Sequence, residues 1–370
     1  MKGTALGITG FALIAVTYGM ARFAWGLMMP EVMHDIPFTR RVSGVLSACS
    51  FAAYCVAVLI APMMTARAGP RFPAAVAALC AALGLLIIAS AVSPWMLGVG
   101  LFIAGMSAGL ASPALASAVS QRIEAEQQPQ MNTVINAGTS MGIMLSVPIL
   151  YWLPGGWRIA CAVFAALAMI CLVPIWRQLP NHSENAQRES WLNHLRQRSL
   201  QRLIFIALFS GVASAAWWSF GPDLLHHIHV SDRMVSLLWL IAGAAGIIGA
   251  LTGPMAKWMG MKRVYWLSQC CLAVPLLLLA FSHHYSAWLF PAVALGGAAY
   301  VTLSGVLLVW GAEATNNAPA VGVGILFFML AAGQVMGSLL FGQLFMLAGA
   351  PTALTLFAAL PLLMMFVIRR

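Results

Sequence analysis

A single arginine, Arg22, stands inside an apolar run that begins at Gly3. A membrane-spanning helix needs about 20 apolar residues, and at about 1.5 Å per residue Arg22 lies only about 9 Å beyond the midpoint of this run. A charge at that depth is costly, so the guanidinium must face protein or water. Its planar fork can pair bidentately with an oxyanion, which makes Arg22 the first candidate for a binding residue.

Helical spacing predicts that Tyr18, Arg22, Trp25 and Met29 share one face of this segment. The cation would then lie in a stripe with two aromatic rings that can line a cavity. The alternative is that Arg22 only pairs with backbone carbonyls or with an acid on a neighbouring helix. We favour a place on a substrate path, because charged residues inside membranes are usually functional.

The composition is that of a polytopic membrane protein: 62% of the 370 residues are hydrophobic and 8% are charged. At about 30 residues per helix and turn, the chain has room for about twelve spans. We therefore expect an all-α protein within the lipid bilayer.

The basic residues predict the orientation of the spans. The outer loops hold only Arg40, Arg41, Arg158 and Arg233, whereas the inner loops and termini hold Lys2, Arg67, Arg71, Arg122, Arg177, Arg188, Arg196, Arg198, Arg202, Lys257, Lys262, Arg263, Arg369 and Arg370. This bias obeys the positive-inside rule and predicts that both termini are cytoplasmic. It also explains the net charge of +10 without a nucleic-acid partner.

The one long polar segment, Arg177 to Arg202, divides the chain almost in half. Its Trp191, Leu192 and Leu195 suggest a helix lying along the membrane surface. We expect two six-helix bundles, residues 1–176 and 203–370, joined by a cytoplasmic linker, residues 177–202.

The second half repeats the first at a nearly constant offset. Ala24-Trp25 and Pro30-Glu31 match Ala216-Trp217 and Pro222-Asp223 at an offset of 192. Near offset 195, Ala137-Gly138-x-x-Met141-Gly142 matches Ala332-Gly333-x-x-Met336-Gly337. Ordered matches of this kind are typical of the repeats that build transporter halves.

With these features the chain resembles the major facilitator superfamily, whose fold has twelve spans in a 6+6 pseudo-twofold arrangement. The segment Ala61 to Arg71 resembles the superfamily's loop between helices two and three, although Ala66 replaces the usual aspartate. Gly156-Trp157-Arg158 is another familiar element, and Gly19 to Phe23 with Pro30 resembles small bacterial members of the YbfB/YjiJ type. The lost aspartate puts the family's charge latch in doubt.

The resemblance implies a secondary active transporter of the bacterial inner membrane that works by alternating access, with protons as the coupling ion. In this fold, helices one, four, seven and ten line the centre, with two, five, eight and eleven beside them. Candidate substrate-binding residues on these helices are Tyr18, Arg22, Trp25, Asn136, Trp217, Tyr300 and Gln334. Candidate coupling or gating residues are Glu31, Asp223, Arg67 and Arg71.

The repeat aligns Arg22 with Ser214, so only one half carries a cation at this level. An uncompensated positive charge in a low-dielectric cavity attracts anions, which makes a small organic anion the leading substrate. Glu31 and Asp223, at outer helix ends, are equally well explained as solvated acids. We expect a monomer and no cofactor.

Two other functions stay open. Drug efflux by proton antiport is suggested by Gly138-x-x-x-Gly142, but the proline that follows in the exporters is missing and close helix packing explains both glycines. Copper or other transition-metal transport is suggested by 22 methionines and by several outer histidines, although methionine is also ordinary core filler. No nucleophile with a base and no phosphate-binding glycine loop supports an enzyme.

Overall fold

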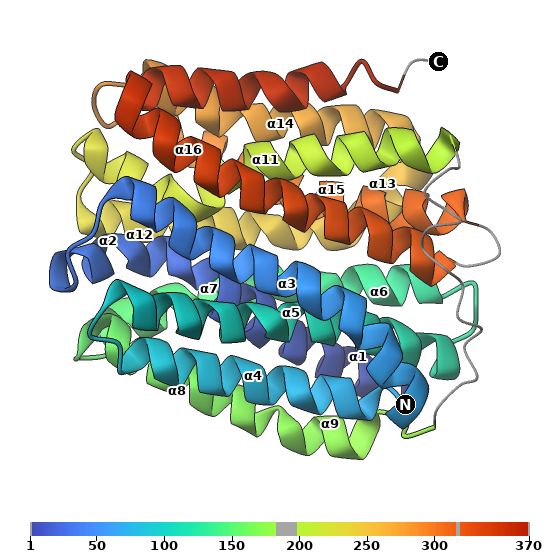
Figure 1. Ribbon diagram of the computed structural model, residues 1–370. Helices are drawn as coiled ribbons and strands as arrows, with labels where there is room; N and C mark the ends of the chain where they lie inside the picture. The colour runs from blue at the N-terminus through green and yellow to red at the C-terminus, as the bar shows by residue number, and fades with distance from the viewer. Residues whose placement is uncertain (1, 183–197, 316–318, 369–370) are drawn as a thin grey trace.

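The helices of the protein run roughly parallel to one another in two groups, one from each half of the chain (Figure 1). The structure, a computed structural model, describes residues 2–182, 198–315 and 319–368. In the first half the helices are α1 (Lys2–Ile14), η1 (Ala15–Phe23), α2 (Ala24–Asp35), α3 (Arg40–Ala68), α4 (Arg71–Ala89), α5 (Pro94–Arg122), α6 (Gln128–Asn136), α7 (Gly138–Trp152), α8 (Gly156–Ile170) and α9 (Leu172–Gln178). In the second half they are α11 (Arg198–His227), α12 (Asp232–Gly246), η2 (Ile247–Leu251), α13 (Thr252–Met259), α14 (Met261–Phe281), α15 (Leu289–Ala314) and α16 (Pro319–Met364).

Within the described residues, 11 helices or continuous helix runs are long and apolar enough to cross a membrane. The last of them, α16, contains Gly349 with φ 80° and ψ 165°, a backbone conformation that glycine adopts without strain. At this residue the helix folds back on itself (Figure 1). An all-helical membrane fold is therefore confirmed, and the exact count of twelve spans stays a prediction.

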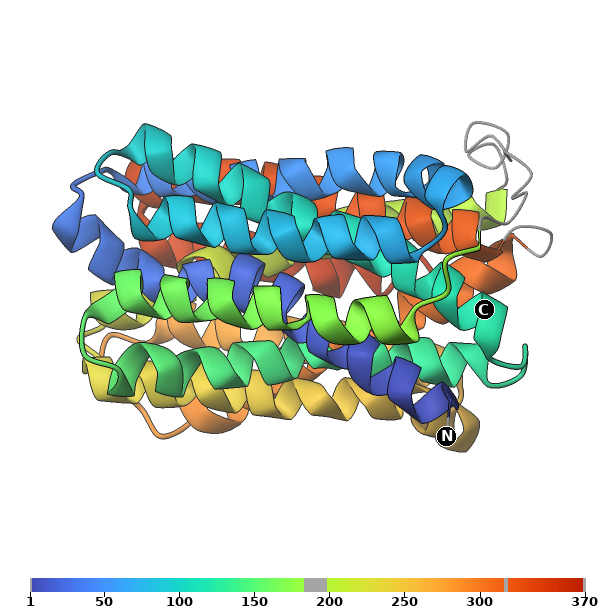
Figure 2. The same cartoon turned by 90° about the horizontal axis from the view of Figure 1, so that it is seen from below.

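Both termini and the ends that flank residues 183–197 lie at one end of the bundle (Figure 1). The opposite end carries the turns after α2, α4, α7 and α11, as the view from below also shows (Figure 2). We call this second end the outer end, following the expected orientation. The proposed surface helix at Trp191 to Leu195 falls outside the described residues.

The most extensive contacts between the two halves join α3 to α16, α7 to α12, and α2 to α11, and α6 also contacts α15 and η2. Local sequence sets where these helices begin. Thr39 accepts a hydrogen bond from the Val42 backbone N–H at the start of α3, and Ser93 does the same for Met96 at the start of α5.

The predicted repeat is visible in how small residues pack inside each half. Gly142 of α7 lies directly against the backbone of Ala15 and Gly19, and Gly337 of α16 lies against the backbone of Val212 in α11. Neither glycine leaves room for a side chain. Close helix packing is therefore the structural role of both motifs.

Candidate functional site

Arg22 lies in η1, a π-helical segment in the middle of the first span. Such segments are uncommon in proteins, and where they occur they often lie at functional sites. Tyr18, Arg22 and Trp25 of the predicted stripe all face α3: Tyr18 bonds Tyr54, Arg22 lies over the rings of Phe51 and Tyr54, and Trp25 donates from its indole N–H to Ser47 Oγ at 3.0 Å. Tyr18 and Arg22 also line a central cavity, which Trp25 does not reach.

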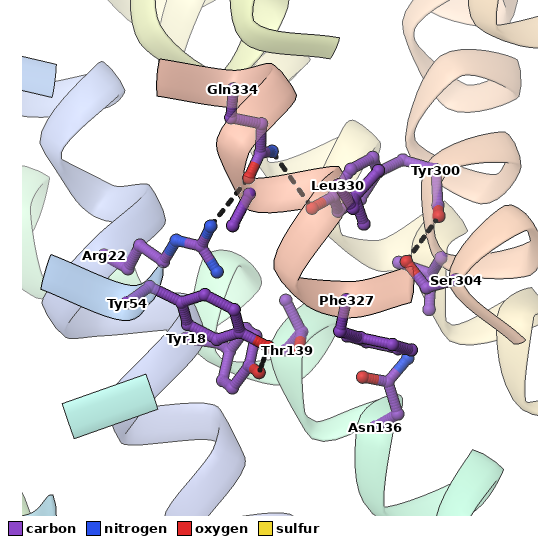
Figure 3. Close-up of a pocket in the computed structure, with 12 residues that line it drawn as sticks. Tyr18, Arg22, Tyr54, Asn136, Thr139, Tyr300, Ser304, Phe327, Leu330 and Gln334 are labelled. Atoms are coloured by element: carbon purple, nitrogen blue, oxygen red, sulfur yellow. Dashed lines mark hydrogen bonds between the residues drawn. The ribbon is translucent and has the colours of Figure 1, made fainter. Parts of the chain in front are cut away.

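The guanidinium of Arg22 is buried, with 4% of the residue exposed, and bonds to the other half of the molecule. Its Nη2 donates to Gln334 Oε1 at 2.6 Å (Figure 3). Gln334 Nε2 in turn donates to Ser214 Oγ at 3.2 Å and to the Tyr300 hydroxyl at 3.1 Å. One amide therefore joins the first span to α11, α15 and α16.

No acid among the described residues forms an ion pair with Arg22. Four aromatic rings surround it instead, with guanidinium-to-centroid distances of 4.5 Å for Tyr54, 4.8 Å for Phe51, 5.2 Å for Phe23 and 5.5 Å for Tyr18. Ring faces stabilise a cation without neutralising it. Arg22 Nε is buried and has no hydrogen-bond partner, so the side chain keeps unused donor capacity.

Hydroxyl groups continue the polar network on the inner side of Arg22. Tyr18 bonds Tyr54 at 3.0 Å and Ser112 at 2.6 Å. The cavity wall is completed by residues of α6, α7, α15 and α16, namely Asn136, Thr139, Tyr300, Val301, Ser304, Phe327, Leu330, Ala331 and Gln334 (Figure 3). The cavity measures about 10 Å³, which is room for about one water molecule. The centre therefore has no space for an organic solute in this conformation.

The structure thus brings together five of the seven predicted binding residues: Tyr18, Arg22, Asn136, Tyr300 and Gln334. Trp25 and Trp217 do not line the cavity, and their role in binding stays a prediction. Sequence reasoning left Phe51 and Phe327 out of the site. The signal that could have found them is position, since Phe51 lies on the second span and Phe327 on the eleventh.

Among the predicted gating residues, Asp223 joins the halves at the outer end. Arg40 of α3 donates to it from Nε at 2.7 Å and from Nη2 at 3.2 Å. The same guanidinium lies 4.6 Å from the ring centroid of Phe345 in α16. Arg40 was not predicted as the partner of Asp223, although it too lies at the outer end of a helix, as the first residue of α3.

The other three predicted gating residues lie elsewhere. Glu31 caps the start of α8 by accepting from the Trp157 backbone N–H, within its own half. Arg71 donates twice to the Leu179 carbonyl oxygen, at 2.9 and 2.7 Å, and so closes the C-terminal end of α9. Arg67 is exposed. These positions give Glu31 and Arg71 structural roles, and their part in gating stays a prediction.

A metal site finds no support in the described part of the chain, where no three His, Cys, Asp or Glu side chains come together as ligands. The residues at the centre are donors, aromatic rings and hydroxyls. This set suits an organic molecule with oxygen acceptors rather than a soft metal ion.

The fold of two helical halves around a polar centre is that of a secondary transporter. The family model of the Major Facilitator Superfamily matches residues 11–338, and the chain belongs to this superfamily. No curated protein sequence matches the chain.

Two solved structures of the nucleoside transporter NupG are similar to the chain. A mutant form superposes with a TM-score of 0.76 at 14% identity and covers 99% of this chain and 98% of the other. A second NupG structure gives a TM-score of 0.72 at 15% identity, covering 99% and 97%. At this identity the likeness concerns the fold.

Proposed function

We propose that the chain is a secondary active transporter that moves a small organic anion across the bacterial inner membrane by alternating access. The observation that carries the proposal is the state of Arg22, a buried cation between the two halves that has no acidic partner among the residues that the structure describes. A buried charge normally needs a counter-charge. In this molecule the substrate supplies it.

Binding of an anion would replace the present partner of Arg22, the Gln334 amide oxygen, with a stronger one. Gln334 offers Arg22 a neutral amide oxygen, whereas a carboxylate offers two charged oxygens that match the guanidinium fork. The nearby Asn136 and Ser304 supply polar groups for the rest of the solute, and the tyrosine and phenylalanine rings supply apolar surface. Because the present cavity holds about one water, the halves must separate before a solute enters.

The Arg40–Asp223 pair supports a gate at the outer end, since it connects α3 of one half with α11 of the other. Protonation of Asp223 would remove the charge that holds this pair. We therefore place proton coupling at Asp223. The bias of basic residues supports cytoplasmic termini in the inner membrane.

The test is uptake of five labelled anions, namely acetate, lactate, succinate, benzoate and gluconate, into right-side-out membrane vesicles that contain the protein. Affinity is expected to fall in the order wild type, Arg22→Lys, Arg22→Ala, because lysine keeps the charge but loses the planar fork. A charge-assisted hydrogen bond contributes roughly 1.5 to 3 kcal/mol, so the alanine variant should bind at least about tenfold more weakly.

A pH-sensitive dye inside the same vesicles reports whether protons move with the anion. Thermal stability of each purified variant serves as the control for folding. If Arg22→Ala lowers only the melting temperature while uptake per folded molecule is unchanged, Arg22 is structural. Uptake of cations in place of all five anions would also contradict the proposal.

A further inference from the structure

Two buried tryptophans outside the central cavity have indole N–H groups without a partner. Trp217 of α11 is 4% exposed and Trp239 of α12 is 0% exposed, and neither Nε1 has a hydrogen-bond partner. The two rings are stacked, with centroids 5.8 Å apart and planes at 28°. The unpaired donors therefore belong to one aromatic pair in the second half.

Among the described residues, two of the three other buried indoles are paired, and the third, Trp218, packs between the rings of Trp239 and Tyr300. Trp25 donates to Ser47 Oγ at 3.0 Å, and Trp157 donates to Asp35 Oδ2 at 2.9 Å. A buried Trp N–H usually finds such a partner, and leaving a buried donor unpaired lowers the stability of the folded state. The Trp217–Trp239 pair places two unpaired N–H donors on two stacked rings. We therefore look for a hydrogen-bond acceptor that these donors meet in another state of the protein.

The pair lies where the outer sides of the two halves close on each other. Gly26 of α2 fits against the Trp218 carbonyl oxygen and lies so close to Trp239 that an added Cβ would be 3.0 Å from Cη2. Gly26 is four residues beyond Arg22, about 6 Å along the helix toward the outer end. Trp218 and Tyr300 connect the pair to the centre, with ring centroids 5.4 Å from Trp239 to Trp218 and 5.3 Å from Trp218 to Tyr300.

We propose that the indole N–H groups of Trp217 and Trp239 form an outer binding station for the oxygen atoms of the transported anion; the inference rests on the proposed function. When α2 moves away from α11 and α12, the faces of these rings open to the outer side. The N–H groups then donate to the anion before it reaches Arg22. Closure of the halves removes room for the anion at the pair and transfers it one helical turn inward, to the stronger cationic partner.

The station explains why unpaired donors persist in the closed state. A donor that is satisfied only by the solute binds it when the outer side is open and releases it when that side closes. A permanent partner within the protein, such as the one Trp157 has, would compete with the solute.

The test uses Trp217→Phe and Trp239→Phe separately, so that one folded variant suffices, with Trp157→Phe as the matched control. All three lose an indole and keep an aromatic ring, but only the control loses a hydrogen bond. In thermal melts without added anion, the control should fall a few °C further than either of the other two variants. Equal losses would mean that the N–H groups have partners, and would overturn the inference.

Uptake of the same five labelled anions into right-side-out vesicles gives the second readout. The KM of each transported anion should rise at least fivefold in Trp217→Phe and Trp239→Phe with Vmax within twofold, whereas Trp157→Phe should keep its KM within twofold. An unchanged KM in both test variants, alongside Arg22-dependent uptake, would refute the station and leave the proposed function standing. If the wild type takes up none of the five anions, both fall.

Discussion

The first and second halves of the chain share a scaffold but not a polar centre. Gly142 and Gly337 both bring a helix into backbone contact with the first span of its half. At the same level, however, Arg22 in one half corresponds to Ser214 in the other, and Thr139 corresponds to Gln334. The symmetric positions carry packing and the asymmetric ones carry chemistry, so differences between the repeats locate the site better than their similarities.

The halves also differ in how their helices are set against each other. Gly19 meets Gly142, the second glycine of its motif, whereas the corresponding Gly211 meets Gly333, the first. Four residues, or about one helical turn, separate the two arrangements. The shift coincides with the π-helical segment η1, whereas the corresponding stretch of α11 is α-helical.

The largest effect on this difference between the halves is expected from a substitution that gives Arg22 a carboxylate partner. Gln334→Glu places a carboxylate where the amide oxygen now lies 2.6 Å from Nη2. We expect the affinity for the transported anion to fall at least about tenfold, since the site is then neutralised from within. Binding is measured by the concentration dependence of vesicle uptake.

Gln334→Met is the control for this change, because it removes the amide without adding charge. It should weaken binding less than Gln334→Glu does. Wild-type affinity in the glutamate variant, or a larger loss in the methionine variant, would show that the free charge of Arg22 does not select the solute.

A second change would make the outer end more symmetric. At the offset of 192, Arg40 corresponds to Asp232 and Asp223 corresponds to Glu31, so the second half has an acid where the first has its arginine. Asp232 is close enough for its charge to act on Glu31. Asp232→Arg would therefore build a second ion pair across the outer end and is expected to slow uptake about threefold.

The measurement for the outer end is labelling of Met29→Cys, on the outer side of Arg22, by a membrane-impermeant maleimide. Asp232→Arg should reduce labelling and Asp223→Asn should raise it severalfold, because the latter removes the existing pair. These pairs are partly solvated, which keeps the expected effects modest. Equal labelling in both variants would rule out a latch at this end.

The smallest effect is expected at Ser214, the counterpart of Arg22. Its hydroxyl accepts from Gln334 Nε2 and donates to the Gly211 carbonyl oxygen of its own helix. Ser214→Ala leaves the Tyr300 hydroxyl as the partner of Gln334, so uptake affinity should change less than about twofold. A tenfold loss would mean that both halves contribute equally to binding.

Hydrophobic runs were enough to predict an all-helical membrane fold and to place Arg22 in the middle of the first span. Helical spacing correctly predicted that Tyr18, Arg22 and Trp25 share a face, but an apolar run carries no signal for which of the three reaches the cavity. The rings around Arg22 come from two spans, Tyr18 and Phe23 from the first and Phe51 and Tyr54 from the second, so only packing could reveal the contacts of the second pair. The Arg40–Asp223 pair could have been sought among outer helix ends of opposite charge.

Arg22 forms no ion pair within the described part of the chain, and this has an electrical consequence. On the proposed mechanism the empty binding site carries one positive charge, whereas the site loaded with a monoanion is neutral. Moving an elementary charge through a membrane potential changes its free energy by about 2.3 kcal/mol per 100 mV, and a partial movement changes it in proportion. In a cycle without a coupled proton, voltage then acts mainly on the return of the empty protein, whereas a proton carried on Asp223 with the solute adds one positive charge to the loaded step.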